Sequence, residues 1–207
     1  MTGIISDNVG RTSGLIKAVA GGGAWTLIKS QTASSSATIS FVDGTSDVVL
    51  DNTYPIYLFQ FINIHPQTDG ADFTFNFSTD GGSNYNVTKT STIFQAYQGE
   101  GGLNPTLNYD SSRDLAQSTA FQVIMQDPGN DNDQSGSGIF YLFNPSDSTF
   151  VKHFISQTNE LQGADYTVEK FLAGYGNTTS AIDAVQFKFA SGNIDDGKIK
   201  LVGLKDS

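Results

Sequence analysis

Residues 54–64, with the sequence YPIYLFQFINI, place apolar side chains on both faces of an extended strand. At a spacing of two, the side chains divide into an aliphatic set and an aromatic set, which are Ile56, Leu58, Ile62 and Ile64, and Tyr57, Phe59 and Phe61. A strand that is apolar on both faces must be covered on both. We therefore expect this strand inside a sheet rather than at its edge, with Pro55 tolerated because it stands at the start.

The stretch DFTFNFST, residues 72–79, has one apolar face and one polar face. Phe73, Phe75 and Phe77 alternate with polar residues, which is typical of a strand that is buried on one side only. The two stretches together predict an all-β, antiparallel β-sandwich.

The composition agrees with a chain of strands and turns. Its 207 residues are enough for one β domain with a substantial core, with or without an appendage. Fifteen Phe and eight Tyr are available to fill that core, and each fully buried Phe contributes about 2–3 kcal/mol. Asp, Asn, Ser, Thr and Gly recur between the apolar runs, where they favour turns.

The charge and the apolar runs exclude several classes of protein. A formal net charge of −10 argues against a surface for nucleic acid or for anionic lipid. No apolar run approaches the ~18 residues that span a bilayer, and the N-terminus lacks the layout of a signal peptide. The chain has no Cys, so disulfides and thiolate metal sites are excluded and the redox compartment is not indicated.

Alternating apolar stretches continue along the chain, separated by turn-rich segments. We expect about ten strands at intervals of about a dozen residues, in the stretches 24–32, 37–42, 54–64, 72–79, 85–97, 121–125, 139–143, 151–157, 167–173, 184–190 and 198–205. This spacing predicts a jelly-roll-like sandwich, although sequence order does not separate a jelly roll from another Greek-key sandwich.

The connections carry three further expectations. Short turns predict one hairpin between 24–32 and 37–42, and a second between 72–79 and 85–97 through a Gly-rich turn. The segment 99–120 is predicted to be a long loop with one helical turn at 112–118. Loops of this length are disproportionately functional.

Residues 1–23 differ from the sandwich domain, which we assign to residues 24–207. Their apolar residues come in clumps without a sustained period, and the stretch ends in Gly21–Gly23, a flexible joint. A disordered terminus is the alternative, but such tails are usually polar throughout. We favour an extended N-terminal arm, able to reach about 75 Å, that docks on a neighbouring subunit of a homo-oligomer or larger assembly. Its expected anchors are Ile4, Ile5, Leu15 and Ile16.

No constellation of catalytic residues is evident, and we predict that the protein is not an enzyme. The sequence has no GxSxG elbow, phosphate-binding loop or HExxH motif. His65 and His153 are its only histidines, and a lone His on an apolar strand face is more often a hydrogen-bonded core residue. The many Asp residues lie in turns, where a solvated side chain is the usual role.

One turn resembles the opening of a calcium loop. Asp131, Asp133 and Ser135, followed by Gly136, have the initial spacing of an EF-hand, but the closing Glu position falls on Leu142. A looser Ca²⁺ site at Asp131 and Asp133 therefore stands beside the alternative of an Asx-rich turn; no other cofactor is expected.

Exposed aromatic residues would suit a host glycan. Tyr97 and Tyr109, in or beside the long loop, are the candidates for stacking on sugar rings. Trp25 alternates with Leu27, so we expect Trp25 in the core instead.

Strand parity predicts where the acidic turns gather. Successive loops of an antiparallel sandwich alternate between its two ends. Counting the expected strands places at one end the loops 43–53, 80–84, 127–138, 159–166 and 191–197. These loops carry Asp and Glu without Lys or Arg, so we expect one strongly acidic pole, from which the arm also leaves. The repulsion there, about 1 kcal/mol per close pair in water, is relieved by splayed loops or by a cation.

Six segments resemble a known family. They are ISDNVGRTSGLIKA (5–18), FINIHPQTD (61–69), FNFSTDGGSNYN (75–86), FNPSDSTFVKHFIS (143–156), GYGNTTSAIDAVQFK (174–188) and SGNIDDGKIKLVGLK (191–205). The chain resembles, over nearly its whole length, small structural proteins of marine tailed bacteriophages, described as virion, tail-fibre or capsid-decoration components. The resemblance implies a β-sandwich that is displayed on the virion and held by its N-terminal segment.

These observations define the expected function. We expect a non-enzymatic virion protein of the capsid or the tail, bound to other virion proteins and without nucleic acid or membrane insertion. The alternative is a carbohydrate-binding module for host attachment. A polysaccharide hydrolase ranks last, because no catalytic pair can be nominated.

Overall fold

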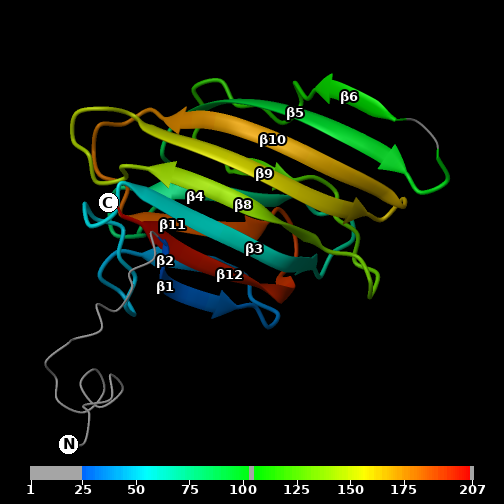
Figure 1. Ribbon diagram of the computed structural model, residues 1–207, viewed down its shortest axis with the longest axis horizontal. Coiled ribbons are helices and arrows are strands. Elements are labelled where there is room, and N and C mark those ends of the chain that lie inside the picture. Colours follow the sequence, from blue (N-terminus) through cyan, green and yellow to red (C-terminus); the bar gives the residue numbers. More distant parts are fainter. Residues whose placement is uncertain (1–24, 103–104, 206–207) are drawn as a thin grey trace, which may run out of the picture.

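Figure 1 shows the computed structural model, which describes residues 25–102 and 105–205. Within these ranges twelve β-strands form two sheets, and every pairing is antiparallel. The same residues contain no helix that is long and apolar enough to cross a membrane. The predicted all-β antiparallel sandwich is therefore confirmed, with twelve strands where about ten were expected.

The two sheets differ in width. In order across the larger sheet, its eight strands are β1 (Trp25–Thr32), β12 (Ile194–Leu204), β3 (Ile56–Pro66), β8 (Gly136–Phe143), β9 (Lys152–Gln162), β10 (Tyr166–Gly176), β5 (Lys89–Gly99) and β6 (Thr106–Tyr109). The smaller sheet has four strands, β2 (Ile39–Val42), β11 (Ala184–Phe189), β4 (Phe73–Ser78) and β7 (Gln122–Met125). The smaller sheet packs on one face of the larger sheet and leaves the other face open (Figure 1).

The core between the sheets is built mainly from phenylalanine. Its fully buried aromatic side chains are Phe41, Tyr57, Phe59, Phe61, Phe73, Phe75, Phe77, Phe140, Phe154 and Phe187. The ring of Phe187 lies 5.2 Å from that of Phe59 and 5.2 Å from that of Phe61, in edge-to-face contacts. Such pairs add about 0.5–1.5 kcal/mol each to the free energy gained from burial.

Strand β3 lies inside the larger sheet, between β12 and β8, as predicted. Its aromatic residues face the smaller sheet and are buried. Of the aliphatic set, Ile56, Leu58 and Ile62 face the other way and Ile62 is exposed, whereas an irregularity between Phe61 and Ile64 turns Ile64 into the core. The expected cover is therefore complete on the inner side, whereas on the outer side neighbouring side chains shield Leu58 but not Ile62.

Strand β4 is more buried than predicted. Phe73, Phe75 and Phe77 face the core, but the polar residues between them are also buried. The side-chain amide of Asn76 donates to the carbonyl oxygens of Tyr85 (2.7 Å) and Thr119 (3.0 Å). The polar face of β4 is therefore closed by loop backbone, which a strand's own alternation does not reveal.

Both predicted hairpins are wrong. β1 pairs with β12 and β2 pairs with β11, so the 33–38 connection crosses from one sheet to the other. The 79–88 connection likewise runs from β4 in the smaller sheet to β5 in the larger one. Gly and Asx residues mark a change of chain direction, but they do not specify whether the next strand pairs with the last.

The 99–120 segment contains a strand, β6, that the sequence analysis missed. β6 pairs with β5 at the edge of the larger sheet, with Phe94 opposite Tyr109. The expected helical turn at 112–118 is absent. A turn at 111–113 is followed by irregular chain, in which the Leu115 carbonyl accepts from the Ser91 N–H at 2.9 Å. Edge strands are exposed on both faces, and this weakens the alternation on which a prediction depends.

The missed strand reverses the predicted positions of all later loops. The end of the sandwich at which β1 begins and β12 ends, here called the termini end, also holds the 43–55 and 79–88 loops. The 126–135 loop lies at the opposite, far end, together with 163–165 and 190–193. In Figure 1 the termini end is on the left, marked by the C-terminus.

The single acidic pole is consequently wrong, and acidic residues occupy both ends. The termini end carries Asp43, Asp47, Asp51, Asp80, Asp147 and Asp183, and the far end carries Asp69, Asp72, Glu100, Asp127, Asp131, Asp133, Asp165, Asp195 and Asp196. β1 does begin at the same end as the 79–88 loop, as the parity argument required. The 1–23 arm itself lies outside the described residues.

Candidate interaction surface

The outer face, which is the face of the larger sheet turned away from the smaller sheet, carries apolar side chains across seven strands. Pairing register places side by side, from β1 to β5, Leu27, Val202, Leu58, Tyr141, Ile155, Ala173 and Thr92. The next row runs through Lys200, Gln60, Ile139, Gln157, Phe171, Phe94 and Tyr109. Directly opposite side chains in such rows lie within contact distance, so the first row is a continuous stripe without a charged residue.

Most of the exposed apolar residues gather on this face. Of the eight large hydrophobic side chains that the described residues expose, seven lie here, namely Trp25, Leu27, Ile62, Phe94, Leu107, Tyr109 and Ile155. The eighth, Phe150, lies in the 144–151 loop. Ile155 is 50 % exposed and Trp25 49 % exposed, so Trp25 is not the core residue that was predicted. Single exposed apolar residues are ordinary, whereas a contiguous set marks an interaction site.

Two adjoining hollows deepen the outer face between β8 and β5. One has a volume of about 390 Å³ and the other of about 440 Å³; both are lined by Thr92, Ile155 and Ala173. The small side chain of Ala173 forms a low point, because its cross-strand neighbours Ile155 and Thr92 are larger. At one rim, the rings of Phe94 and Phe171 stack at 4.9 Å with an interplanar angle of 8°. The lining of the smaller hollow is mainly apolar, and its polar residues are Thr92, Tyr141, Ser156 and Gln157.

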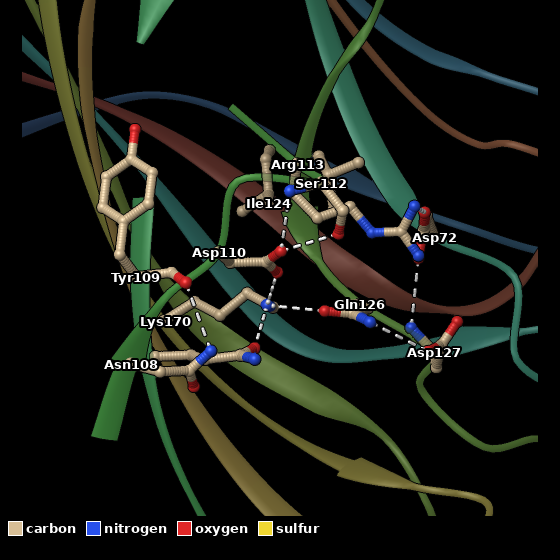
Figure 2. Close-up of polar contacts among 12 residues, drawn as sticks. Asp72, Asn108, Tyr109, Asp110, Ser112, Arg113, Ile124, Gln126, Asp127 and Lys170 are labelled. Atoms are coloured by element: carbon tan, nitrogen blue, oxygen red, sulfur yellow. Dashed lines mark hydrogen bonds and ion pairs between the residues drawn. The ribbon is translucent and has the colours of Figure 1, made fainter. Parts of the chain in front are cut away.

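A buried polar network lies on the other side of the same sheet (Figure 2). Lys170 of β10 is 1 % exposed, and its Nζ donates to Asp110 Oδ2 at 3.2 Å and to Gln126 Oε1 at 2.8 Å. It also donates to the side-chain oxygen of Gln95. Burial raises the pKa of Asp110, but hydrogen bonds from Ser112 and the Lys170 charge outweigh that effect, and the net shift is downward.

A second ion pair continues this network toward the far end. The Arg113 guanidinium lies 3.3 Å from Asp72 Oδ2, and Asp72 Oδ1 accepts from the Asp127 N–H at 3.2 Å (Figure 2). Burial raises the pKa of Asp72 and the Arg113 charge opposes that shift. The pair ties the 110–121 segment to the start of β4.

Glu160, near this network, has one buried carboxylate oxygen without a hydrogen-bond partner among the described residues. That atom is Oε2, whereas Oε1 accepts from the Gln126 N–H at 3.0 Å. Burial raises the pKa of Glu160 to about 8, against the opposing effects of that hydrogen bond and of the Lys170 charge. Such shifts occur at catalytic sites and in structural ion networks alike.

Whether a substrate could reach these charged groups decides between a catalytic site and a structural network. The nearest hollow, of about 360 Å³, is lined by Gln95, Gln126 and Tyr97 among others, but by neither Lys170 nor Glu160. The charged groups therefore lie behind their amide partners, out of reach of a substrate. We interpret the network as a structural element that fixes β10, β7 and the 110–121 segment to one another.

The two tyrosines predicted to bind glycan are not brought together. Tyr109 lies on the outer face, exposed, and its hydroxyl donates to Asp114 Oδ2 at 2.6 Å. Tyr97 lies on the inner face, since it stands three residues from Phe94 along β5, and its ring contacts that of Tyr166 at 6.0 Å. Only Tyr109 is therefore placed to join an aromatic surface.

Asp131 and Asp133 lie in the 126–135 loop at the far end. Asp133 lines a polar hollow of about 540 Å³ with Asp195 and Asp196, and the Asp131 carbonyl lies 3.2 Å from His65 Nε2. Among the residues that the structure describes, no group of three or more His, Cys, Asp or Glu is positioned to hold a metal ion. The prediction of a Ca²⁺ site gains no support from this arrangement.

The remaining predicted positions also have definite locations. His153 is exposed on the outer face, where its ring lies 6.2 Å from that of Tyr175, so the expected core position is wrong. The docking residues of the arm, Ile4, Ile5, Leu15 and Ile16, lie outside the described residues.

The outer face itself was not predicted, although one signal for it was present. The aliphatic set of residues 54–64 indicated an apolar second face, and Leu58 of that set stands in the middle of the stripe. Extending the same count to residues 139–143, 151–157 and 167–173 would have added Tyr141, Ile155 and Phe171.

The chain matches no protein-family model, no curated protein and no solved structure.

Proposed function

We propose that the protein is a non-enzymatic structural component of a bacteriophage virion, displayed on the capsid or the tail. In this proposal the sandwich assembles with other virion proteins and with further copies of itself, and the N-terminal arm attaches it to a neighbouring subunit. The resemblance of six sequence segments to marine phage structural proteins supports the virion assignment.

The observation that carries the proposal is the apolar outer face. A row of seven paired positions without a charge, Leu27 to Thr92, is presented by a chain whose formal net charge is −10. A face of this kind is costly to leave in water and is typical of surfaces that are covered in an assembly. A rigid sandwich with one sealed core and one open apolar face suits a building block of a particle.

The experiment is to locate the chain on intact particles. An antibody raised against the purified protein would be applied to phage particles from a lysate that contains the chain, with gold labelling and electron microscopy. We expect labelling at regular positions on the shell or the tail. Antibody that has been pre-absorbed with the protein is the control, and a chain found in the lysate but missing from purified particles would contradict the proposal.

A second candidate function is binding of a host glycan, and a specific observation favours it. Tyr109 is exposed on the outer face beside the stacked pair Phe94–Phe171, and aromatic faces of this kind stack on sugar rings. On an array of host surface polysaccharides, Tyr109→Ala would abolish binding, whereas Tyr97→Ala on the inner face would not. Equal loss in both variants would indicate a folding defect instead.

A further inference from the structure

We infer that the outer face of the eight-stranded sheet is the binding site for the N-terminal segment of this chain, residues 1–23. The inference rests on the proposed function in one respect, because that proposal makes the arm the attachment element. It goes beyond it by naming the surface that receives the arm.

The first step is that the outer face is incomplete as it stands. Leu58 and Val202 are already shielded by their neighbours, at 2 % and 7 % exposed, while the flanking Leu27 and Ile155 remain open. Covering that exposed apolar surface would gain roughly 25 cal/mol for each Å² removed from water. The smaller sheet cannot provide the cover, because it occupies the opposite face.

The second step concerns the chemistry of what could bind there. A glycan or a nucleic acid would bring many hydroxyl or phosphate oxygens to a central stripe whose polar side-chain groups are the hydroxyls of Tyr141 and Thr92. Burying those oxygens without hydrogen bonds is unfavourable by several kcal/mol. Aliphatic side chains carry no such penalty, and the hollows of about 390 and 440 Å³ suit them.

The third step is that the N-terminal segment has apolar residues suited to the outer face and joins the sandwich beside that face. It contains the aliphatic pairs Ile4–Ile5 and Leu15–Ile16. It enters the described structure at Trp25, whose side chain lies on the outer face opposite Leu204. The segment thus joins the sandwich at the rim of the surface that we assign to it.

The fourth step is reach. Seven strand spacings of about 4.8 Å make the outer face about 34 Å wide. Twenty-three extended residues span about 75 Å. The segment is long enough to cross the face of the copy it belongs to, or to cross onto the same face of an adjacent copy.

The absence of Cys from the natural sequence allows a direct test on the full-length chain. Ser13→Cys places a thiol beside Leu15 in the arm, and Thr92→Cys places one in both hollows. Asn132→Cys, exposed in the far-end loop, is the matched control acceptor. A short bismaleimide reagent is then applied to the double variants and, separately, to mixtures of the single variants.

The cross-links report both docking and its direction. Cross-linked dimer in the mixture of Ser13→Cys with Thr92→Cys shows docking between copies, and an internal link in the double variant shows docking within one copy. Either result supports the inference, provided that its yield exceeds that of the Asn132→Cys control. Yields equal to the control in both formats overturn it.

Side-chain variants then separate docking from chance proximity. Ile16→Ser in the arm, or Ile155→Ser on the face, should lower the cross-linking yield at limiting protein by at least about tenfold, the equivalent of one lost aliphatic contact. Lys17→Ser, a polar neighbour in the arm, should leave the yield unchanged. A yield that is indifferent to Ile16→Ser and Ile155→Ser contradicts the inference.

The outcomes also distinguish this inference from the proposed function. An internal link alone would keep the outer face as the site of the arm while removing its role in attachment to a neighbour. A chain that is missing from virions would remove the proposed function, and the cross-links would still stand.

Discussion

The inner face of the eight-stranded sheet packs phenylalanine rings against a second sheet, whereas its outer face presents an apolar stripe to solvent. The two faces use the same strands and alternate residue by residue, so Phe154 is sealed in the core and Ile155 beside it is half exposed. The apolar character of a strand residue therefore does not show whether that residue faces the core or the solvent. The inner face is needed for stability, and the outer face is free to serve an interaction.

The largest expected difference is between those two neighbouring residues of β9. Phe154→Ala should lower the free energy of unfolding by about 3–5 kcal/mol, because it opens a cavity among Phe75, Phe77 and Phe140. Ile155→Ala should cost less than about 1 kcal/mol, since the side chain is half in water already. Urea unfolding of both variants measures the contrast, and equal losses would show that the outer face is part of the core.

A buried charge provides the next contrast. Lys170→Ala should cost about 3 kcal/mol, because it leaves Asp110 buried without its cation. Lys200→Ala, at the β12 position of the outer face, should cost less than about 0.5 kcal/mol. Thermal or urea unfolding at neutral pH compares the two, and a Lys170→Ala variant as stable as wild type would refute the structural role assigned to the network.

Ionisation of Glu160 should make the free energy of unfolding depend on pH. Its pKa in the folded protein, about 8, lies above the value of about 4.3 in an unfolded chain. Between these values the folded state holds a proton that the unfolded state has lost, so stability falls as pH rises. Measurements at pH 5 and pH 7 are best placed, because burial lowers the pKa of Lys89 to about 7 and Lys89 adds the opposite trend above that pH.

Glu160→Gln should weaken this decline, because the amide does not ionise. Glu169→Gln on the outer face is the matched control and should keep the wild-type difference between pH 5 and pH 7. A Glu160→Gln variant with an undiminished decline would assign the effect to another group, such as Asp72.

The smallest expected effect is a coupling free energy between two side chains of the outer face. The stacked rings of Phe94 and Phe171 should show a coupling of about 0.5–1 kcal/mol in a double-mutant cycle with alanine. A coupling near zero would mean that the pair is held only by its strands. In that case the contact between the two rings would add nothing to stability.

The sandwich class and all strands but one were predictable because alternation is a local signal. The stretch 72–79 and the Asp80–Asn84 turn were located from their own residues, and β4 and its turn are found there. Pairing partners were not predictable in this way, and both expected hairpins proved to be crossings between sheets. A turn signal describes a few residues, whereas the choice of sheet depends on the whole chain.

The missed strand shows how one local error spreads. β6 has only four residues, and three of them are exposed, so its sequence TLNY carries little alternation. Its omission moved every later loop to the wrong end and created an acidic pole that the structure divides between two ends. The polar network was also beyond prediction, because Asp110, Gln126 and Lys170 meet only through the fold.

The pairing of Trp25 with Leu204 has a mechanical consequence. β1 and β12 are antiparallel neighbours, so polypeptide preceding one and following the other leaves from the same corner of the sandwich. A force applied between these two points would pull the strands apart one hydrogen bond at a time, as a zipper opens. The same bonds would share the load if the points of attachment lay at opposite ends. A particle that exerts tension on this protein would therefore hold it most securely through one terminus and a surface, rather than through both termini.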